Sequence, residues 1–436
     1  MNRTENSLPQ NWRLRSLDSL GKVLSGATPS TRVPDFWNGD IAWITPADLS
    51  RQETPFINST ERNISEKGMR GCAATLIPKN NLVVSSRAPI GYVAIPTMEF
   101  CTNQGCKSIW LDKQQDSLFH YYNLCFHIKK LKDKGEGTTF AEISKTALGA
   151  VQLPVPDSKH TQSKVGEVLS AADEAIEKLS NHICKLERIK VGLRQVLLSR
   201  GIDQKGRIRD PLGSDDFTDS EFGRIPKSWR PCTLNEIVDR RRPIVYGILM
   251  PGTGFSGGVP VVKVKDIVGG TIDLADLLLT DPKIDEAYKR SRLRAGDLLF
   301  TIRGTVGRMA FVPESLDGAN ITQDTARIAI KGAVRGFIRH FLEMPTPRRF
   351  VDIHTIGQAV RGINLLEVRR IPILCPPEGE QQLLADILDS QDAVVSRERD
   401  RLENLRRLRT GLMQDLLTCR VSVEPLVNME LTTIQS

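Results

Sequence analysis

Residues 165–197 read VGEVLSAADEAIEKLSNHICKLERIKVGLRQVL, and residues 384–416 read LADILDSQDAVVSRERDRLENLRRLRTGLMQDL. In both stretches mainly apolar residues recur in alternating steps of four and three, and the matching positions lie 219 apart. The positions are Val165, Leu169, Ala172, Ile176, Leu179, Ile183, Leu186, Lys190, Leu193 and Leu197, then Leu384, Leu388, Gln391, Val395, Glu398, Leu402, Leu405, Arg409, Leu412 and Leu416. This sustained period of about 3.5 residues predicts a left-handed coiled coil. Two amphipathic helices lying on separate domains would normally show a wider face with a period of about 3.6 residues.

An antiparallel, symmetric register of the two helices makes the numbers of facing residues sum to 581. Lys190 then faces Gln391, and Arg409 lies over the small Ala172. We expect the charged ends of these long side chains to reach water.

The duplication extends beyond the helices. LPQNWRLRSL from Leu8 returns as IPKSWRPCTL from Ile225, and LVVSSRAPIGYVAI from Leu82 returns as LLFTIRGTVGRMAFV from Leu298. A period this long indicates a duplicated domain, because solenoid units recur every 20–50 residues. We expect an α+β fold, in which two β-rich mixed domains are separated by two long helices that form an antiparallel coiled coil, related by a pseudo-two-fold repeat. Strands are predicted at 41–44, 81–86, 92–95, 259–264, 297–302 and 308–312, with turns at Gly39, Asn80–Asn81, Gly258, Gly296 and Gly304.

These patterns divide the chain into six segments. The predicted segments are a first module at 1–157, a helical spacer at 158–200, a linker at 201–222, a second module at 223–377, a second helical spacer at 378–419 and a tail at 420–436.

The charge of the chain is unevenly distributed. The net charge is +8, with +3 in residues 1–157, +9 in residues 223–377 and −4 in residues 378–436. Positive modules indicate a partner that is a polyanion. No apolar run reaches the ~18 residues of a membrane span, and the N-terminus lacks the apolar core of a secretory signal, so we expect a cytoplasmic protein.

Motifs for metal binding and catalysis are missing from the sequence. The eight cysteines form no CxxC and are expected to be reduced, and Cys101 and Cys106 with His120 and His127 fit no zinc spacing, so no metal is expected. Neither GxxxxGK[ST] nor HExxH occurs. CPPEG at 375–379 lacks the asparagine and the aromatic residue of an adenine methyltransferase motif.

Four segments carry a resemblance to a known family. They are GRIPKSWR at 223–230, TIRGTVG at 301–307, PPEGEQQLLADILDSQD at 376–392 and LRTGLMQDLLT at 408–418. Together with their first-half counterparts, over roughly residues 8 to 420, they resemble the DNA-specificity subunit of type I restriction–modification systems. One departure concerns the N-terminal capping of the first helix, where Thr161-Gln162 stands in place of Glu380-Gln381.

The resemblance implies two target-recognition domains and no catalytic activity. It implies that the chain binds an asymmetric, bipartite sequence of double-stranded DNA and positions two modification (methyltransferase) subunits, which methylate adenine with S-adenosylmethionine. Restriction (translocase/endonuclease) subunits, with ATP and Mg, join that complex, and this chain binds no cofactor itself. The spacer fits such a role, because Val165 to Leu197 spans roughly 48 Å of helix and half-sites lie about 34–36 Å apart per turn of DNA.

Residues near the strand ends are the candidates for contacting DNA. They are Ser85, Ser86, Arg87, Tyr92, Asn103, Gln104 and Lys107 in the first module, and Lys263, Lys265, Arg303, Arg308, Gln323 and Thr325 in the second. Arginine suits guanine or phosphate and amides suit adenine, although a salt bridge that holds the turn is an equal alternative for Arg87 and Arg303. The equivalence of Gln104 and Gln323 favours a shared structural or backbone-binding role. The run Arg240–Arg242 either meets phosphates or forms a solvated loop.

Two other functions stay open at this point. The first is a self-contained DNA endonuclease or methyltransferase, and the second is a coiled-coil adaptor without a DNA role.

Overall fold

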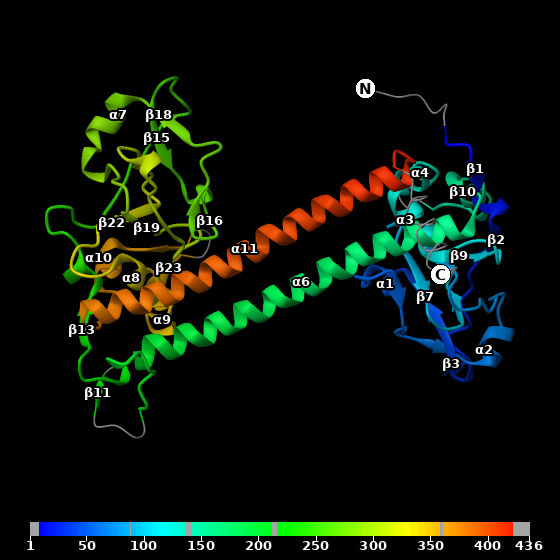
Figure 1. Ribbon diagram of the computed structural model, residues 1–436, viewed down its shortest axis with the longest axis horizontal. Helices are drawn as coiled ribbons and strands as arrows, with labels where there is room; N and C mark the ends of the chain where they lie inside the picture. The colour runs from blue at the N-terminus through cyan, green and yellow to red at the C-terminus, as the bar shows by residue number, and fades with distance from the viewer. Residues whose placement is uncertain are drawn as a thin grey trace, which may run out of the picture. The chain divides into compact units, whose positions relative to one another are not determined.

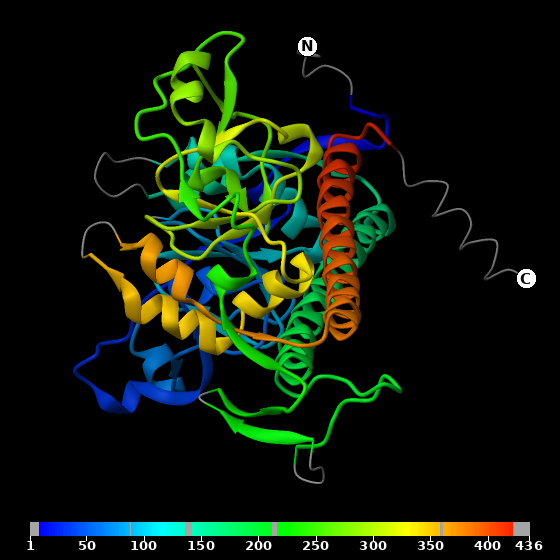
Figure 2. The ribbon, with the colours of Figure 1, turned by 90° about the vertical axis from the view of Figure 1, so that its left-hand side faces the viewer.

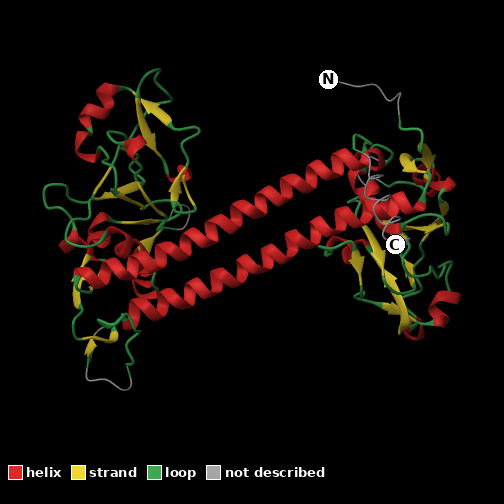
Figure 3. Ribbon diagram, in the orientation of Figure 1, coloured by secondary structure: helices red, strands yellow, loops and turns green. Residues whose placement is uncertain are grey.

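The computed structural model describes residues 8–87, 89–135, 142–211, 216–220, 222–357 and 361–421 (Figure 1). They fall into two compact units, Met1–His182 with Arg399–Ser436, and Ile183–Glu398. Each unit contains one mixed module and part of the long helices α6 (Lys159–Arg200) and α11 (Glu378–Leu417). Figure 3 distinguishes the strands of both modules from the two long helices. The predicted tail beyond residue 421 and linker residues 212–215 and 221 lie outside the described residues.

The first module is built from three sheets and short helices. The sheets have the orders β2-β9-β6-β7-β4, β5-β3-β8 and β1-β10. The strands are β1 (Trp12–Ser16), β2 (Gly21–Ser25), β3 (Trp37–Ile44), β4 (Phe56–Ile57), β5 (Asn63–Ile64), β6 (Leu82–Ser85), β7 (Val93–Pro96), β8 (Phe100–Thr102), β9 (Cys106–Leu111) and β10 (Gln152–Pro156). The helices are α1 (Pro46–Ser50), α2 (Glu66–Arg70), α3 (Ser117–Phe126), α4 (Ile128–Lys132) and α5 (Lys145–Gly149), with 3-10 turns η1 (Leu17–Ser19) and η2 (Pro34–Phe36).

Strand β6 separates two hydrophobic cores because successive side chains on a strand point to opposite faces. Leu82 and Val84 pack in a cluster with helix α3 and the long helices, whereas Val83 packs in a second cluster with Ile44. All four residues of the strand are buried. The continuous apolar run LVVS therefore follows from burial on both faces.

The second module repeats this plan with more strands. Its larger sheets have the orders β14-β22-β19-β20 and β18-β15-β21, and β11-β12, β13-β25, β16-β17 and β23-β24 form pairs. The strands are β11 (Phe217–Ser220), β12 (Gly223–Pro226), β13 (Arg230–Thr233), β14 (Val245–Tyr246), β15 (Val259–Val262), β16 (Ile267–Val268), β17 (Thr271–Ile272), β18 (Leu278–Thr280), β19 (Leu298–Thr301), β20 (Met309–Phe311), β21 (Asn320–Ile321), β22 (Thr325–Ile328), β23 (Thr355–Ile356), β24 (Gly362–Ile363) and β25 (Pro372–Cys375). The helices are α7 (Pro282–Ala287), α8 (Arg335–Leu342), α9 (Pro345–His354) and α10 (Leu365–Arg370), with 3-10 turns η3 (Leu234–Ile237), η4 (Val264–Asp266), η5 (Lys289–Ser291) and η6 (Glu314–Leu316).

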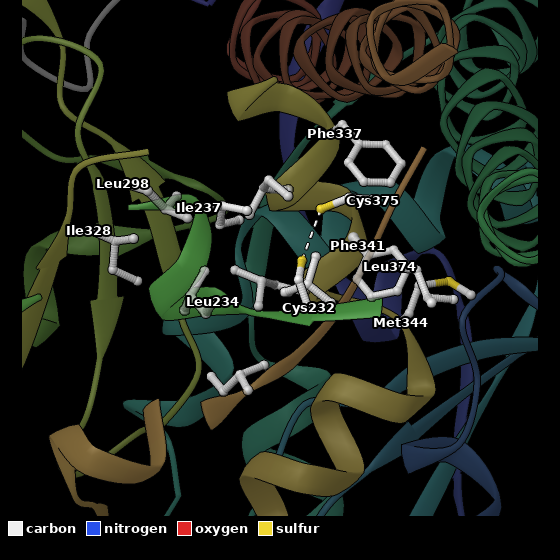
Figure 4. Close-up of a cluster of buried hydrophobic side chains, with 14 of the residues drawn as sticks. Cys232, Leu234, Ile237, Leu298, Ile328, Phe337, Phe341, Met344, Leu374 and Cys375 are labelled. Carbon is white, nitrogen blue, oxygen red and sulfur yellow. Dashed lines mark hydrogen bonds between the residues drawn. The ribbon is translucent and has the colours of Figure 1, made fainter. Parts of the chain in front are cut away.

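Strand β19 separates two cores as β6 does. Leu298 and Phe300 belong to the large cluster that includes helix α8, and Leu299 belongs to a smaller cluster on the other face of the sheet. Figure 4 shows part of the large cluster, where Cys232 of β13 and Cys375 of β25 approach each other with 3.1 Å between their sulfur atoms. Both thiols are free, as predicted for the described cysteines.

The predicted strands are confirmed at β3, β6, β7, β15, β19 and β20. One predicted turn is wrong. Gly39 lies inside β3, at the point where its pairing with β5 shifts register between Trp37 and Ile41. A bulge, which inserts extra residues in one strand, accounts for the glycine there.

The predicted antiparallel pairing of the helices is confirmed within each unit. In the first unit Val165 and Leu169 share a cluster with Leu416, and in the second Leu197 shares one with Leu384. In the first unit the start of α6 thus packs against the end of α11. In the second unit the end of α6 packs against the start of α11 (Figures 1 and 2). All twenty predicted seam positions are buried or half-buried.

Two ion pairs connect the helices in the predicted register, to within one residue. Arg409 Nε lies 2.5 Å from Asp173 Oδ1, and Lys190 Nζ lies 2.5 Å from Asp392 Oδ1. These cations therefore bind acidic partners on the facing helix and do not extend into water as expected. Burial lowers the pKa of Arg409, but hydrogen bonding to Asp173 raises it overall. Burial raises the pKa of Asp392, but Lys190 lowers it overall.

Each ion pair also holds a helix of the adjoining module. Tyr122 of α3 donates its hydroxyl to Asp173 Oδ2 at 2.8 Å, and Arg339 of α8 donates Nη2 to Asp392 Oδ2 at 2.7 Å. Asp173 and Asp392 are 219 positions apart, as are the matching helix positions. We name these two sites the helix–module junctions.

A buried glutamine repeats at the start of both long helices. Gln162 Nε2 donates to the Pro156 carbonyl at 3.0 Å, and Gln381 Nε2 donates to the Pro376 carbonyl at 2.7 Å. The amide oxygens accept from the backbone N–H groups of Asp116 and Val334, respectively. The departure at Thr161 therefore leaves this contact unchanged. Glu380 has a separate task, since it accepts from Arg209 and from the Trp229 indole.

Across the described ranges, no helix is both long and apolar enough to cross a membrane.

The register predicts a specific crosslink. Cysteines replacing Ile176 and Leu405 are expected to form a disulfide within one chain, because both positions lie on the seam and their numbers sum to 581. Peptide mapping by mass spectrometry after mild oxidation checks this and separates the new bond from reactions of the exposed Cys184. The control combines Ile176→Cys with Leu408→Cys, because Leu408 is exposed and lies outside the seam. Equal linkage in both pairs, or none in the first, would contradict the register.

Candidate nucleic-acid interface

A hydroxyl-capped turn places the candidate arginine in each module. Ser85 Oγ accepts from the N–H groups of Gly91 and Tyr92, at 2.9 and 2.8 Å, and donates to the Pro89 carbonyl. Thr301 Oγ1 accepts from the Arg308 N–H at 2.8 Å and donates to the Thr305 carbonyl. Gly91 and Gly307 have φ values of 104° and 86°, which favour glycine and explain why it recurs. The repeated motif is a rigid turn that starts at a buried strand.

The same turn brings the predicted arginines beside the predicted glutamines. The Arg87 N–H donates to the Gly105 carbonyl at 3.3 Å, and the Arg303 N–H donates to the Asp324 carbonyl at 3.2 Å. Gln104 and Gln323 directly precede these two carbonyl residues. In both modules the turn that carries the arginine therefore lies beside the segment that carries the glutamine.

In the first module the candidate cations are already paired. Arg87 Nε lies 2.9 Å from Glu142 Oε2, and Lys107 Nζ lies 3.5 Å from Glu142 Oε1. Gln104 Oε1 accepts a hydrogen bond from the Thr28 hydroxyl. Arg87 is therefore held by the salt bridge that was one of its two predicted roles, while half its side chain stays exposed.

The other first-module candidates differ in exposure. Tyr92 is 39% exposed at the tip of the turn, and Asn103 is half-buried with an Oδ1 atom that accepts no hydrogen bond from the described residues. Tyr92, Arg87 and Gln104 thus present the polar groups of the predicted first-module set that a ligand can reach, whereas the Asn103 Oδ1 atom is buried.

In the second module Arg303 and Gln323 line a hollow of about 1000 Å³. No carboxylate among the described residues pairs with the exposed Arg303. The hollow combines this guanidinium and amide with exposed apolar side chains, among them Tyr246 at 51% and Ile356 at 77% exposure. A bidentate guanidinium, an amide and apolar surface are the groups that read guanine, adenine and the thymine methyl.

The remaining second-module candidates lie elsewhere. Lys263 and Lys265 line a separate hollow with Asp276, and Lys265 Nζ is 3.1 Å from Asp266 Oδ1. Arg308 lines a third hollow with Arg348, and its Nη1 donates to the Ile267 carbonyl at 3.2 Å. The predicted set is thus split over three places.

Four candidates are buried and receive structural roles. Ser85, Ser86 and Thr325 are 0% exposed, and Lys107 is 5% exposed. Ser85 holds the turn, and Lys107 Nζ donates to the Gln104 carbonyl at 3.3 Å. A base-reading role for these residues stays an untested prediction, and their burial favours support of the neighbouring loop instead.

Sequence reasoning missed the other residues that shape the second-module hollow. They are Tyr246, Leu249, Ile302, Ile356, Gly357, Gly362, Ile363, Asn364, Leu365, Leu366 and Arg369. They come from segments more than a hundred residues apart, so no local pattern joins them.

One group of side chains has the composition of a metal site. His340, Asp389 and Asp392 place ligand atoms within 4.8 Å of one another. However, Arg339 Nη2 lies 2.8 Å from Asp389 and 2.7 Å from Asp392, and Lys190 also pairs with Asp392. The carboxylates are neutralised by cations of the protein, so the group serves the helix–module junction.

Comparisons with known proteins agree with this architecture. Residues 9–188 match the family model described as the type I restriction modification DNA specificity domain. The type I restriction enzyme MjaIX specificity subunit of Methanocaldococcus jannaschii is 27% identical over 430 residues, which cover 96% of this chain and 95% of that protein.

Two solved structures share the fold. The type I restriction–modification S subunit from M. genitalium aligns with a TM-score of 0.54 at 17% identity, covering 95% of this chain and 98% of that chain. A chain from a study of complex assembly and conformational transition of the type I R-M system aligns with a TM-score of 0.57 at 16% sequence identity. The alignment covers 94% of this chain and 98% of that chain. The resemblance predicted from the sequence is confirmed.

The turn geometry predicts a stability effect at Thr301. In Thr301→Val, the Thr305 carbonyl and the Arg308 N–H lose their hydrogen bonds to a buried hydroxyl, and each loss costs about 0.5–1.5 kcal/mol because Thr305 and Arg308 are exposed residues. Denaturant unfolding of the full chain should show this loss. The control is Thr305→Val. The Thr305 side chain is exposed, and only its backbone carbonyl accepts the hydrogen bond from Thr301. Equal free energies of unfolding for both variants would refute the role of the hydroxyl.

Proposed function

We propose that this chain, which resembles type I restriction–modification specificity subunits over nearly its whole length, reads an asymmetric, bipartite DNA sequence for such a complex. The observation that carries the proposal is the pair of modules that share one scaffold and differ at its tip. Arg87 is paired with Glu142, whereas Arg303 opens onto a hollow with Gln323. Two modules with the same backbone framework but different exposed side chains suit two different half-sites.

The charge of the modules supports DNA as the ligand. Residues 223–377 carry a net charge of +9 and residues 1–157 carry +3. Basic surfaces supply general attraction to the DNA backbone, while groups such as Arg303 and Gln323 supply base contacts. The antiparallel helices act in this proposal as a stiff spacer, so that unread bases between the half-sites are spanned and not contacted.

The helices also offer surface for protein partners. Large apolar side chains on them are solvent-exposed, including Ile189 at 58%, Val191 at 52% and Leu408 at 56%. Exposed apolar side chains of this size offer contact area to a protein partner. We assign these faces to the modification subunits, with S-adenosylmethionine, ATP and Mg bound by partner subunits and the catalytic steps carried out there.

The function is tested by sequencing modified bases in the host genome with and without this gene. Loss of adenine methylation at one asymmetric, gapped motif is expected, because the chain selects the site for the methyltransferase. An unchanged methylome, in a host whose modification subunit co-purifies with the chain, would reject the proposal. Methyl transfer or DNA cleavage by the isolated chain would favour the enzyme alternative, and a chain that binds no DNA at any salt concentration would favour the adaptor.

A single substitution tests the second-module hollow. Arg303→Ala should weaken specific binding by about 1–3 kcal/mol and relax the preference at one position of one half-site, because a bidentate base contact is lost. Competition binding with a set of single-base variants of the methylated motif measures this. The control is Arg370→Ala, an exposed arginine that pairs with Glu367 outside the hollow. A uniform loss over all sequences would instead indicate a phosphate contact.

A further inference from the structure

The second module contains a basic pocket that is distinct from the Arg303 hollow. Its volume is about 460 Å³, and its lining includes Arg241, Arg290, Arg294 and Arg327. Within the described ranges, none of these four forms an ion pair with a carboxylate. Arg242 and Arg292 also line the pocket, but they pair with Asp297 and Asp285. One acidic residue, Asp317, lines the pocket as well and accepts a hydrogen bond from the Ala295 N–H, and Lys289 in the lining pairs with Glu286. The four unpaired arginines outnumber this carboxylate, so the pocket holds a surplus of positive charge.

Arg327 forms the floor of the pocket. It lies on β22, opposite Val245 on β14, and is 1% exposed. Its Nη2 donates to the carbonyls of Pro243 and Arg290, both at 3.1 Å. Its Nε and Nη1 are buried and donate to no described protein atom. The Nε and Nη1 hydrogens of this guanidinium, at the base of the pocket, thus have no partner among the described residues.

The charge of Arg327 is not neutralised by the fold. Burial and, to a lesser extent, the nearby Arg242 lower its pKa to about 10, while Asp297 opposes them. The guanidinium consequently stays protonated near neutral pH. A buried charge is costly unless it is paired, so an anion in the pocket would stabilise this arrangement.

The scaffold does not require an arginine at this place. The matching position of the first module is Ser108, which pairs with Val83 on β6 as Arg327 pairs with Leu299 on β19. Ser108 is also buried. Arg327 is therefore a feature of the second module that the first module lacks.

We propose that this pocket binds a phosphate group, with Arg327 donating from the floor and Arg290 and Arg294 from the rim. Guanidinium groups bind phosphate oxygens in a bidentate manner through charge-assisted hydrogen bonds. The phosphate belongs either to the DNA backbone or to a free phosphate compound. The DNA source rests on the proposed function, whereas the phosphate chemistry does not.

The position of the pocket makes the two sources distinguishable. Val245 lines the phosphate pocket and its neighbour Tyr246 lines the Arg303 hollow. Neighbouring residues on a strand point to opposite faces, and β14 is the edge strand of its sheet. A duplex in the hollow reaches the pocket around this edge, whereas a free phosphate compound binds without touching the hollow.

The first experiment measures binding of inorganic pyrophosphate to the full chain by calorimetry. Wild type and Lys283→Gln should bind equally, since Lys283 is exposed and lies outside the pocket. Arg327→Ser, which copies the first module, and Arg294→Gln should each weaken binding at least about tenfold. Arg294 is exposed, so its variant tests the pocket even if Arg327→Ser fails to fold.

The second experiment measures the salt dependence of affinity for non-specific duplex DNA. If the DNA backbone occupies the pocket, Arg294→Gln should reduce the slope of log affinity against log salt by about 0.9, and Lys283→Gln should leave it unchanged. An unchanged slope with pyrophosphate binding identifies a free phosphate compound as the ligand. Pyrophosphate binding that is absent or equal in all variants, together with an unchanged slope, would overturn the pocket. Absence of DNA binding by wild type would contradict the proposed function alone.

Discussion

The structure depends on the paired charges Asp173–Arg409 and Asp392–Lys190 between the long helices. Half-buried pairs of this kind contribute modest net stability, because desolvation offsets much of the attraction. Their effect is on geometry: each aspartate also accepts from a module helix, through Tyr122 in one unit and Arg339 in the other. A slip of the helices by one turn would separate Arg409 from Asp173 and Lys190 from Asp392. The junctions therefore fix the register and the attachment of each module together.

The duplication has preserved contacts that hold the backbone and has changed side chains that face outwards. The glutamines at 162 and 381 make the same two hydrogen bonds, and the hydroxyls of Ser85 and Thr301 cap the same turn. By contrast, Glu142 pairs with Arg87, while Arg303 has no such partner in the described part of the chain. The two modules thus share a frame of backbone contacts and differ in the side-chain groups that they expose.

The helices and main strands could be predicted because their signals are local and periodic. The seam positions predicted the two long helices and their pairing, and the apolar runs at β6 and β19 predicted equivalent strands in the two modules. The candidate site was only partly predictable. Proximity to a strand end could not separate exposed Tyr92 from buried Ser86, since the chain reverses between them. The hollow around Arg303 joins Tyr246 with Ile356, and such a meeting depends on tertiary packing that no spacing encodes.

The unequal pairing of Arg87 and Arg303 has a consequence for kinetics. The first module must loosen its bond to Glu142 before that guanidinium is free, whereas the second module presents its cation at once and carries the larger net charge. Diffusional encounter with a polyanion is accelerated by unpaired charge and slowed by salt. Under the function proposed above, the second module is therefore expected to meet DNA first and the first module to engage more slowly.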